Sequence, residues 1–386
     1  MAPSMTVGLV WLVFGGTHVG LATRPVRHRL VARLGENGFT ALYSLVAVAS
    51  FAALVGTYAV LRDEGAPGLG ITPALRPVLI ALVVFGIVLS VAGIIPYPSS
   101  SYALFRTTSR PEPRGLERIT RHPFFAGTAL LGMAHALLAS RLVGVVFFAT
   151  LALFALAGAW HQDRKLLAAR GTPHAELMER TSIVPFVAIL TGRQRLGARE
   201  LPVGALVLGA AAAWALNQAH ASIFAHGGAY VVIAVVGGAL LSSLQAWQRE
   251  GLRGRGLLER LLGPALVLLG IVHAAATLVL FPDAVSTIVA QGVAGAISAA
   301  SHGDVKAAFW FALFAPALVL FGWLTSHALV RDDQALLSLL AWFLVGTGVI
   351  GAVIIPVSGF WAVLAVGVSM LRVAAPRPCN VAERAL

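Results

Sequence analysis

The chain has 386 residues, of which 58% are hydrophobic and only 11% are charged. A soluble domain of this composition would have too few charged side chains to cover its surface, so an ordinary soluble protein is excluded. The formal net charge of +12 would suit a nucleic-acid-binding protein, and the positions of the basic residues decide between that class and a membrane protein.

Long apolar runs recur along the whole chain, and each is close to the roughly 20 residues that a helix needs to cross a bilayer. Eleven such runs are expected, at residues 5–22, 40–61, 75–95, 123–140, 142–160, 201–218, 228–247, 261–281, 307–328, 335–355 and 358–373. The runs are rich in Ala and Leu and do not alternate, and only helices satisfy their own backbone hydrogen bonds in lipid. The sequence therefore predicts an all-α polytopic membrane bundle of about 11 transmembrane helices.

The 28 Lys and Arg residues are distributed periodically between these runs. If the N-terminus is outside, all but four fall in cytoplasmic segments, and the exceptions are Arg62, Arg76, Arg141 and Lys306. The positive-inside rule thus explains both the topology and the charge, with the C-terminus in the cytoplasm and the chain in a bacterial inner membrane. Anionic headgroups are the expected partners of the basic residues, and nucleic acid is not needed. Because no basic residue precedes the first run, a retained helix is expected there.

Two domains are expected, with seven and four spans. Residues 1–247 form the first, residues 248–260 are a basic, Gly-rich cytoplasmic linker, and residues 261–386 form the second. The proline-rich stretch 97–121 is expected to be a cytoplasmic loop. The single cysteine, Cys379, lies in the polar tail, so disulfides, iron–sulfur ligation and covalent heme attachment through a CxxCH motif are excluded within this chain.

Histidine is the only ionisable residue type that lies well inside the predicted spans, and an intramembrane polar group is a functional candidate because its burial is costly. Three histidines qualify: His18, His135 and His273. Each follows a glycine by three residues, and these are Gly15, Gly132 and Gly270. A helical side chain covers the preceding turn, so each glycine would leave space under the imidazole for a flat macrocycle. The alternative interpretation is close helix packing at small residues.

A second candidate opens the fourth predicted span, where Arg121 and His122 precede Pro123 at the positive end of the helix. This end is an expected anion site for a heme propionate or a lipid phosphate, and an ordinary helix start is the alternative. The segment Trp160 to Lys165 is interpreted as an interfacial anchor with an Asp–Arg pair. His220 and His226 lie in a short outer loop, as a peripheral metal site or as solvated histidines.

Several segments of the chain resemble the motifs of a known family. Gly16-Thr-His18-Val-Gly-Leu-Ala22 is similar to the first histidine motif of the NnrU family, to which the 15-cis-zeta-carotene isomerases also belong. A second, longer match runs through Arg118-Ile-Thr-Arg-His-Pro123, Ala134-His135, Gly158-Ala-Trp160, Arg180 to Phe186 and Gly192-Arg-Gln194. Residues 261–373 resemble a small uncharacterised family of four-helix membrane domains, which suggests a fusion and implies no activity.

The resemblance implies a b heme with His18 and His135 as axial ligands, bound within the membrane. In the isomerase branch it further implies that a redox-dependent change of iron ligand drives cis-to-trans isomerisation of a polyene. The alternative ligand of that branch is a thiol three residues before the second histidine, where this chain has Gly132. The chain therefore lacks the residue that the ligand change requires.

The depths of the two histidines raise a geometric question. His135 lies about 20 Å along its helix from His122, whereas His18 is near the cytoplasmic end of the first span. Three explanations are open: the first helix continues past Arg24 at a tilt, the Arg121–Pro123 turn lies below the hydrocarbon boundary, or His122 replaces His135 as ligand. The first is favoured, because residues 24–33 would extend an amphipathic helix.

Three functions compete on the sequence alone. The first is a heme-dependent isomerase or redox enzyme that acts on a lipid-soluble substrate. The second is a non-enzymatic accessory, sensor or assembly protein of nitrite and nitric oxide respiration, as the bacterial branch of the family implies. The third is a membrane scaffold whose histidines are packed and hydrogen-bonded without a cofactor.

Overall fold

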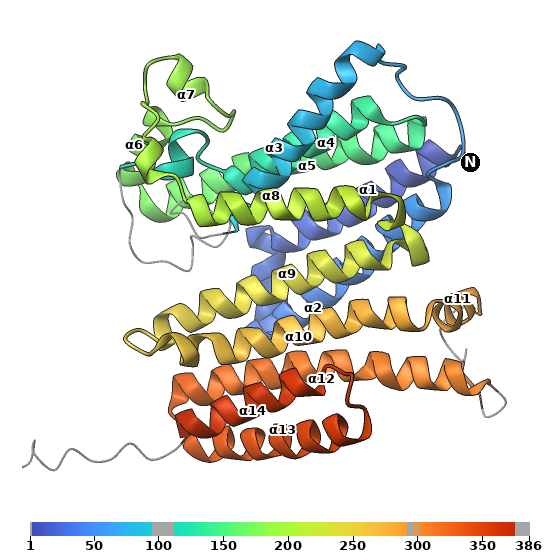
Figure 1. Cartoon of the computed structure of the whole chain (residues 1–386). Helices are drawn as coiled ribbons and strands as arrows, with labels where there is room; N and C mark the ends of the chain where they lie inside the picture. The colour runs from blue at the N-terminus through green and yellow to red at the C-terminus, as the bar shows by residue number, and fades with distance from the viewer. Residues whose placement is uncertain (1, 95–111, 292–296, 299–300, 375–386) are drawn as a thin grey trace, which may run out of the picture. The chain divides into compact units, whose positions relative to one another are not determined.

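The computed structural model describes residues 2–94, 112–291, 297–298 and 301–374. The C-terminal tail with Cys379, and the part of the predicted cytoplasmic loop up to residue 111, lie outside the described residues. Within them the chain is helical, and the one β-bridge joins Pro67 to Arg141. Figure 1 shows the helices in chain order.

Eight of the described helices are long and apolar enough to cross a membrane, and three shorter apolar helices coincide with the remaining predicted spans. The all-α polytopic membrane bundle is thereby confirmed. The eleven helices are α1 (Pro3–Ala22), α2 (Arg24–Leu61), α3 (Arg76–Gly93), α4 (Pro123–Leu138), α5 (Leu142–Arg170), α8 (Val203–Gln218), α9 (Ala225–Gly251), α10 (Leu257–Leu280), α12 (Gly303–Arg331), α13 (Gln334–Ile354) and α14 (Phe360–Ala374).

Four shorter elements between these helices bear on the sites described below. They are η3 (Gly115–Arg118), α6 (Thr172–Arg180), η5 (His220–Ser222) and α11 (Pro282–Ala290). The segment that follows Phe281 is helical in α11. Regular helix stops at Ile354 and resumes at Phe360, so residues 355–359 connect α13 to α14.

The first predicted helix does not continue past Arg24, so the favoured explanation for the depth of His18 is wrong. α1 ends at Ala22, and Thr23 has extended backbone angles (φ −65°, ψ 143°). A new helix, α2, begins at Arg24 with Pro25 in its first turn, where a proline costs no hydrogen bond. α2 is itself interrupted at Gly35, whose φ of 72° is readily adopted only by glycine.

The chain divides into two compact units, residues 1–232 and 233–386. The division falls inside α9, whereas the sequence predicts a boundary at residue 247, which stays a prediction. The end of α9 is tied into the second unit, because the Gln248 side-chain amide donates to Ser326 Oγ at 2.6 Å. The predicted linker 248–260 is mostly helical: α9 includes its first four residues and α10 its last four, so only residues 252–256 connect the two.

In the first unit, α4 packs between α3 and α5, while α1 contacts α2 and α5. The α3–α4 contact is made at glycines: a Cβ on Gly86 would lie 2.7 Å from the Gly127 carbonyl oxygen and 2.9 Å from the Leu131 nitrogen. In lipid, where helices gain little from apolar burial against each other, such close backbone approach is a main source of association. These glycines therefore set how closely α3 and α4 approach.

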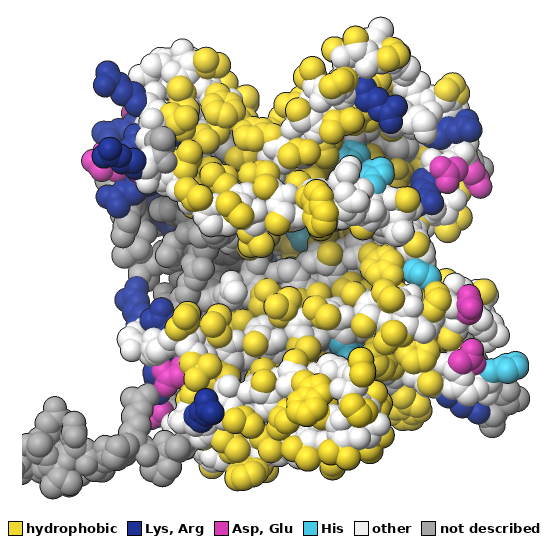
Figure 2. Space-filling model, viewed as in Figure 1, with side chains coloured by type: hydrophobic (Ala, Val, Ile, Leu, Met, Phe, Trp, Pro, Cys, Tyr) yellow, Lys and Arg dark blue, Asp and Glu magenta, His cyan; other side chains and the backbone are white. Residues whose placement is uncertain are grey.

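In the second unit, α10 packs along α12, and α13 packs along α14. Its core consists mainly of leucines, among them Leu266, Leu318 and Leu344, which are at most 1% exposed. Large apolar side chains elsewhere on both units face outward, for example Leu12, Trp310 and Val353. Figure 2 shows hydrophobic side chains along the helices and charged side chains at the helix ends, as a lipid-facing surface requires.

We predict that Gly86→Leu destabilises the first unit, because its side chain would meet backbone atoms of α4 that cannot move aside. Overpacking of this kind costs about 1–3 kcal/mol, and it should lower the midpoint of thermal unfolding measured on the purified protein in detergent. Gly204→Leu on α8 is the matched control, since nothing lies within 4 Å of a Cβ there. Equal midpoints for the two variants would contradict the packing argument.

Candidate functional site

His18 lies among aromatic side chains from three helices of the first unit. The Tyr43 hydroxyl of α2 is 3.1 Å from its Nε2 and 3.3 Å from its Nδ1. Phe14 on α1 and Phe154 on α5 flank the ring, with centroids 5.4 Å and 5.8 Å away. His18 is thus a half-buried imidazole with the Tyr43 hydroxyl as its hydrogen-bond partner and aromatic rings beside it.

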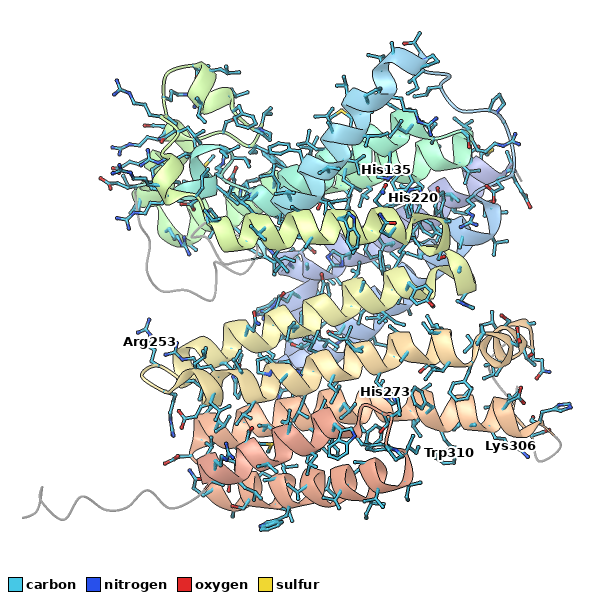
Figure 3. The ribbon with its side chains drawn as sticks, viewed as in Figure 1. His135, His220, Arg253, His273, Lys306 and Trp310 are labelled. Carbon is cyan, nitrogen blue, oxygen red and sulfur yellow. The ribbon has the colours of Figure 1, made fainter. Side chains whose placement is uncertain are left out.

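His135 has a fixed tautomer. Its Nδ1 is 3.0 Å from the Leu131 carbonyl oxygen, and because a carbonyl can only accept, Nδ1 must carry the proton. Nε2 then holds a lone pair, which is the state in which histidine binds a metal. Phe148 of α5 stacks on the ring at 4.7 Å, and the ring of His220 in η5 lies 6.4 Å away. Figure 3 shows His135 and His220 next to each other.

His18 and His135 contact α5 at different residues. His18 does so at Phe154 and His135 at Phe148. Six residues along a helix correspond to a rise of about 9 Å and to contact points about 120° apart around its axis. The pairing of His18 with His135 across one iron stays a prediction.

The glycines that precede the candidate histidines are filled by neighbouring helices. A Cβ on Gly132 would lie 2.8 Å from the Phe148 carbonyl oxygen and 2.9 Å from the Ala152 nitrogen, and one on Gly270 would lie 2.8 Å from the Ala315 carbonyl oxygen. Next to Gly15, the Phe154 ring is at ordinary contact distance, 3.7 Å. The alternative interpretation, close helix packing, describes Gly132 and Gly270.

Arg121 and His122 bind a carboxylate of the chain itself. Asp163 on α5 accepts hydrogen bonds from Arg121 Nε at 2.9 Å and Arg121 Nη2 at 2.7 Å, and His122 Nε2 lies 2.8 Å from its other oxygen. His174 of α6 approaches that same oxygen through Nε2 at 3.3 Å. All four residues are buried, and Asp163 is 2% exposed. The predicted anion site thus contains the anion Asp163.

This cluster joins three segments of the first unit: the turn before α4, the end of α5, and α6. Two further hydrogen bonds extend it, from Arg121 N to the Ser182 carbonyl and from Thr120 Oγ1 to the Ile183 carbonyl. Among the described residues, the buried Nδ1 of His174 has no hydrogen-bond partner. The cluster therefore fixes the start of α4 against the segment that follows α6.

The sequence interpretation missed Asp163 and His174. Trp160 is the expected anchor, because it is 57% exposed and Arg164 lies over its ring at 4.8 Å. The aromatic–basic pattern of this segment led the sequence interpretation to assign Asp163 to the same exposed surface. A signal was present in the periodicity: Ala152, Ala155, Ala159 and Leu166 are buried at helical spacing, and Asp163 falls on that stripe. A carboxylate on an apolar stripe requires a buried cationic partner.

A second polar clamp lies at the same end of the first unit. Arg118 of η3 donates from Nε to Glu200 at 2.9 Å and from Nη1 to Gln194 at 3.1 Å. The Arg118 hydrogen bond holds the pKa of the Glu200 carboxyl below its usual value. Arg193 donates to the carbonyls of Glu179 and Thr181. The polar motif residues Arg118, Arg121, Arg193 and Gln194 therefore all form hydrogen bonds within the protein.

His273 is the remaining intramembrane histidine, and it belongs to the second unit. Its Nε2 donates to the Phe311 carbonyl at 2.9 Å, and its ring stacks on the Phe311 ring at 3.9 Å. These contacts join α10 to α12 and account for the histidine as a packed polar group. Among the described residues, no group of three or more His, Cys, Asp or Glu side chains could hold a metal ion.

Comparisons with known proteins agree with the division into two parts. A family model described as NnrU protein matches residues 5–227, and one described as Family of unknown function (DUF6463) matches residues 258–377. The 15-cis-zeta-carotene isomerase, chloroplastic, of Zea mays is 38% identical over 106 residues, covering 26% of this chain and 29% of that protein. Its counterpart in Arabidopsis thaliana is 27% identical over 204 residues, covering 50% of this chain and 53% of that protein.

The chain therefore spans no more than about half the length of these curated relatives. No solved structure matches it.

We predict that Asp163→Asn is strongly destabilising, because it removes the buried carboxylate that pairs with Arg121 and accepts from two imidazoles. Removing one partner of a buried ion pair costs about 3–5 kcal/mol, which thermal unfolding in detergent would detect. Glu36→Gln is the matched control, because it removes a carboxylate from the exposed pair with Arg27, whose side chains are 47% and 63% exposed. An exposed pair contributes about 0–1 kcal/mol. A similar loss in both variants would contradict a structural role for the cluster.

Proposed function

Since the chain belongs to the NnrU protein family, we propose that it is a b-type heme-binding membrane protein that acts on a lipid-soluble polyene. The substrate class follows from the curated relatives, which are named 15-cis-zeta-carotene isomerases. The observation that supports the cofactor is His135, whose Nδ1 is bonded to Leu131 and whose Nε2 keeps a lone pair in an apolar environment. A neutral imidazole held in one orientation is suited to be an axial ligand of heme iron.

The donor set of the first unit fits a heme better than a metal ion bound by protein ligands alone. The described residues supply no group of three donors, and a heme needs only axial ligands from the protein, because the porphyrin supplies four nitrogens. When bound, heme supplies one-electron and Lewis-acid chemistry within the membrane. His18 and His135 contact α5 at different residues, Phe154 and Phe148.

The residues of the chain have two tasks in this function. His135, positioned by Leu131 and stacked on Phe148, provides a neutral ligand nitrogen. The apolar outer faces of the helices exclude water and admit a substrate from lipid. The Asp163 cluster is saturated by Arg121, His122 and His174, so it has a positioning role rather than an acid–base role.

One observation favours a second candidate, a heme-bearing accessory protein without isomerase activity. Gly132 occupies the position of the thiol that the isomerase branch uses, and the backbone of α5 fills the space beside it. A cysteine there would collide with the Phe148 carbonyl oxygen unless α4 and α5 moved apart. A change of iron ligand to a thiol at this position is therefore unavailable to this chain.

The cofactor is tested by the visible spectrum of protein expressed with sufficient heme and purified in detergent. We expect a sharp Soret band and split bands after reduction, and we expect His135→Ala to weaken or abolish both. The exposed His28→Ala serves as the control for removal of any histidine. Colourless wild-type protein would exclude the heme.

The two candidate functions differ in catalysis. We expect membranes containing the heme-loaded protein to convert a cis-polyene to its trans isomer under reducing conditions, measured by chromatography of the extracted pigment. Heme-loaded membranes that convert none of the polyene, beside an isomerase-positive control, would favour the accessory role.

A further inference from the structure

The Tyr43 hydroxyl is bonded to the His18 imidazole across two helices of the first unit. Its oxygen, on α2, lies 3.1 Å from Nε2 and 3.3 Å from Nδ1 of the histidine on α1. Both distances are within hydrogen-bond range, and both side chains are partly buried. Because the hydroxyl reaches both ring nitrogens, it can stay bonded to the ring when either nitrogen is engaged elsewhere.

Aromatic packing holds α1 against α2 without this hydroxyl. Phe14, one turn before His18, contacts Phe51 of α2 with ring centroids 5.5 Å apart. The ring of Tyr43 itself stacks on Phe39 at 5.9 Å. A phenylalanine at position 43 would make the same ring contacts, so the hydroxyl adds one interaction, the hydrogen bond to the imidazole. That bond therefore acts on His18 more than on the packing of the two helices.

The helical turn that precedes His18 is less crowded than the one that precedes His135. Next to Gly15 the nearest atoms are 3.7 Å from the place of a Cβ, which is ordinary contact. The backbone of α5 comes within 2.8 Å of the same place at Gly132. Since a helical side chain covers the turn before it, the side of the His18 ring that faces this turn is not closed by a neighbouring backbone.

We propose that Tyr43 is the positioning residue of His18, its hydroxyl accepting a hydrogen bond from one ring nitrogen while the other binds the heme iron. This inference rests on the proposed function and on the axial role that the family resemblance implies for His18. A neutral imidazole has one N–H and one lone pair. When the lone pair is given to a metal, the other nitrogen carries the proton, and the Tyr43 oxygen accepts it. Such a partner orients a metal-bound histidine and raises the basicity of its ligating nitrogen.

His135 has a partner of the same kind, the Leu131 carbonyl, which accepts from Nδ1 at 3.0 Å. Leu131 is one turn back on the same helix, so this acceptor moves with its histidine. Tyr43 instead comes from α2, so the orientation of His18 depends on how α1 and α2 pack. A more basic imidazole stabilises ferric iron, and second-shell hydrogen bonding is one of the levers on heme potential. Removing the Tyr43 acceptor should therefore raise the reduction potential.

The test is the substitution Tyr43→Phe in protein expressed with heme and purified in detergent. We expect the reduction midpoint potential of the heme to rise, measured by spectroelectrochemical titration. The affinity for heme, measured by competition with apomyoglobin, should fall about 10–100-fold, as is typical for loss of a partner of a metal ligand. The sharp absorption bands should remain, because no ligand is removed.

Tyr58→Phe is the matched control. Tyr58 also lies on α2, and its ring contacts Phe147, Phe148 and Phe224. We expect its potential and heme affinity to equal those of the wild type. His18→Ala should lose the sharp bands, which separates loss of a ligand from loss of its positioning partner. Unchanged elution profiles and thermal midpoints in both tyrosine variants would show that a shifted potential is not a folding defect.

Three results would overturn the inference. If heme-loaded Tyr43→Phe keeps the wild-type potential and affinity, Tyr43 does not act through His18, while the proposed heme stands. If both tyrosine variants shift the potential alike, the effect comes from α2 as a whole and not from the hydroxyl at His18. If the wild type carries no heme, the proposed function fails and this inference fails with it.

Discussion

Close backbone contact between helices is the constraint on which the first unit depends. Lipid offers little gain for burying one apolar side chain against another, so helices associate where small residues let backbones approach. Gly86 and Gly127 make this contact between α3 and α4, and Gly132 makes it between α4 and α5. The same contacts fix the rotation of α4, and with it the side of the helix from which His135 projects. The packing of α4 and the direction of the His135 side chain therefore depend on the same glycine contacts.

The buried Asp163 cluster solves a second problem, the start of α4 at the end of the bundle. A charge that is withdrawn from water must be paired and hydrogen-bonded, and Asp163 receives a guanidinium and two imidazoles. Because these donors come from the turn before α4 and from α6, the cluster ties both segments to α5. Arg121 and His122 thus hold the scaffold, and His135 at the other end of α4 remains available for chemistry.

The two units differ in how they use their intramembrane histidines. His273 donates to the Phe311 carbonyl and stacks on its ring, which makes it part of the α10–α12 contact. His135 also bonds a carbonyl, but that carbonyl is one turn back on its own helix, so its other nitrogen is left for a partner outside the helix. The same residue type therefore serves packing in one unit and is prepared for ligation in the other.

The sequence by itself determined the membrane class and the approximate positions of the eleven apolar helices, because hydrocarbon thickness and backbone hydrogen bonding leave few alternatives. Nine of them agree with the predicted bounds to within four residues, whereas α2 begins 16 residues before its predicted span and α5 ends ten residues after its own. The break after Ala22 was not predicted, although Thr23 and Pro25 are residue types typical of the start of a new helix. The tertiary structure alone decided which polar groups meet. Asp163 pairs with Arg121, and His220 lies beside His135. Such pairings depend on how each helix is rotated against its neighbours. The hydrophobic pattern does not encode this rotation, because a span that faces lipid on most sides is apolar all round.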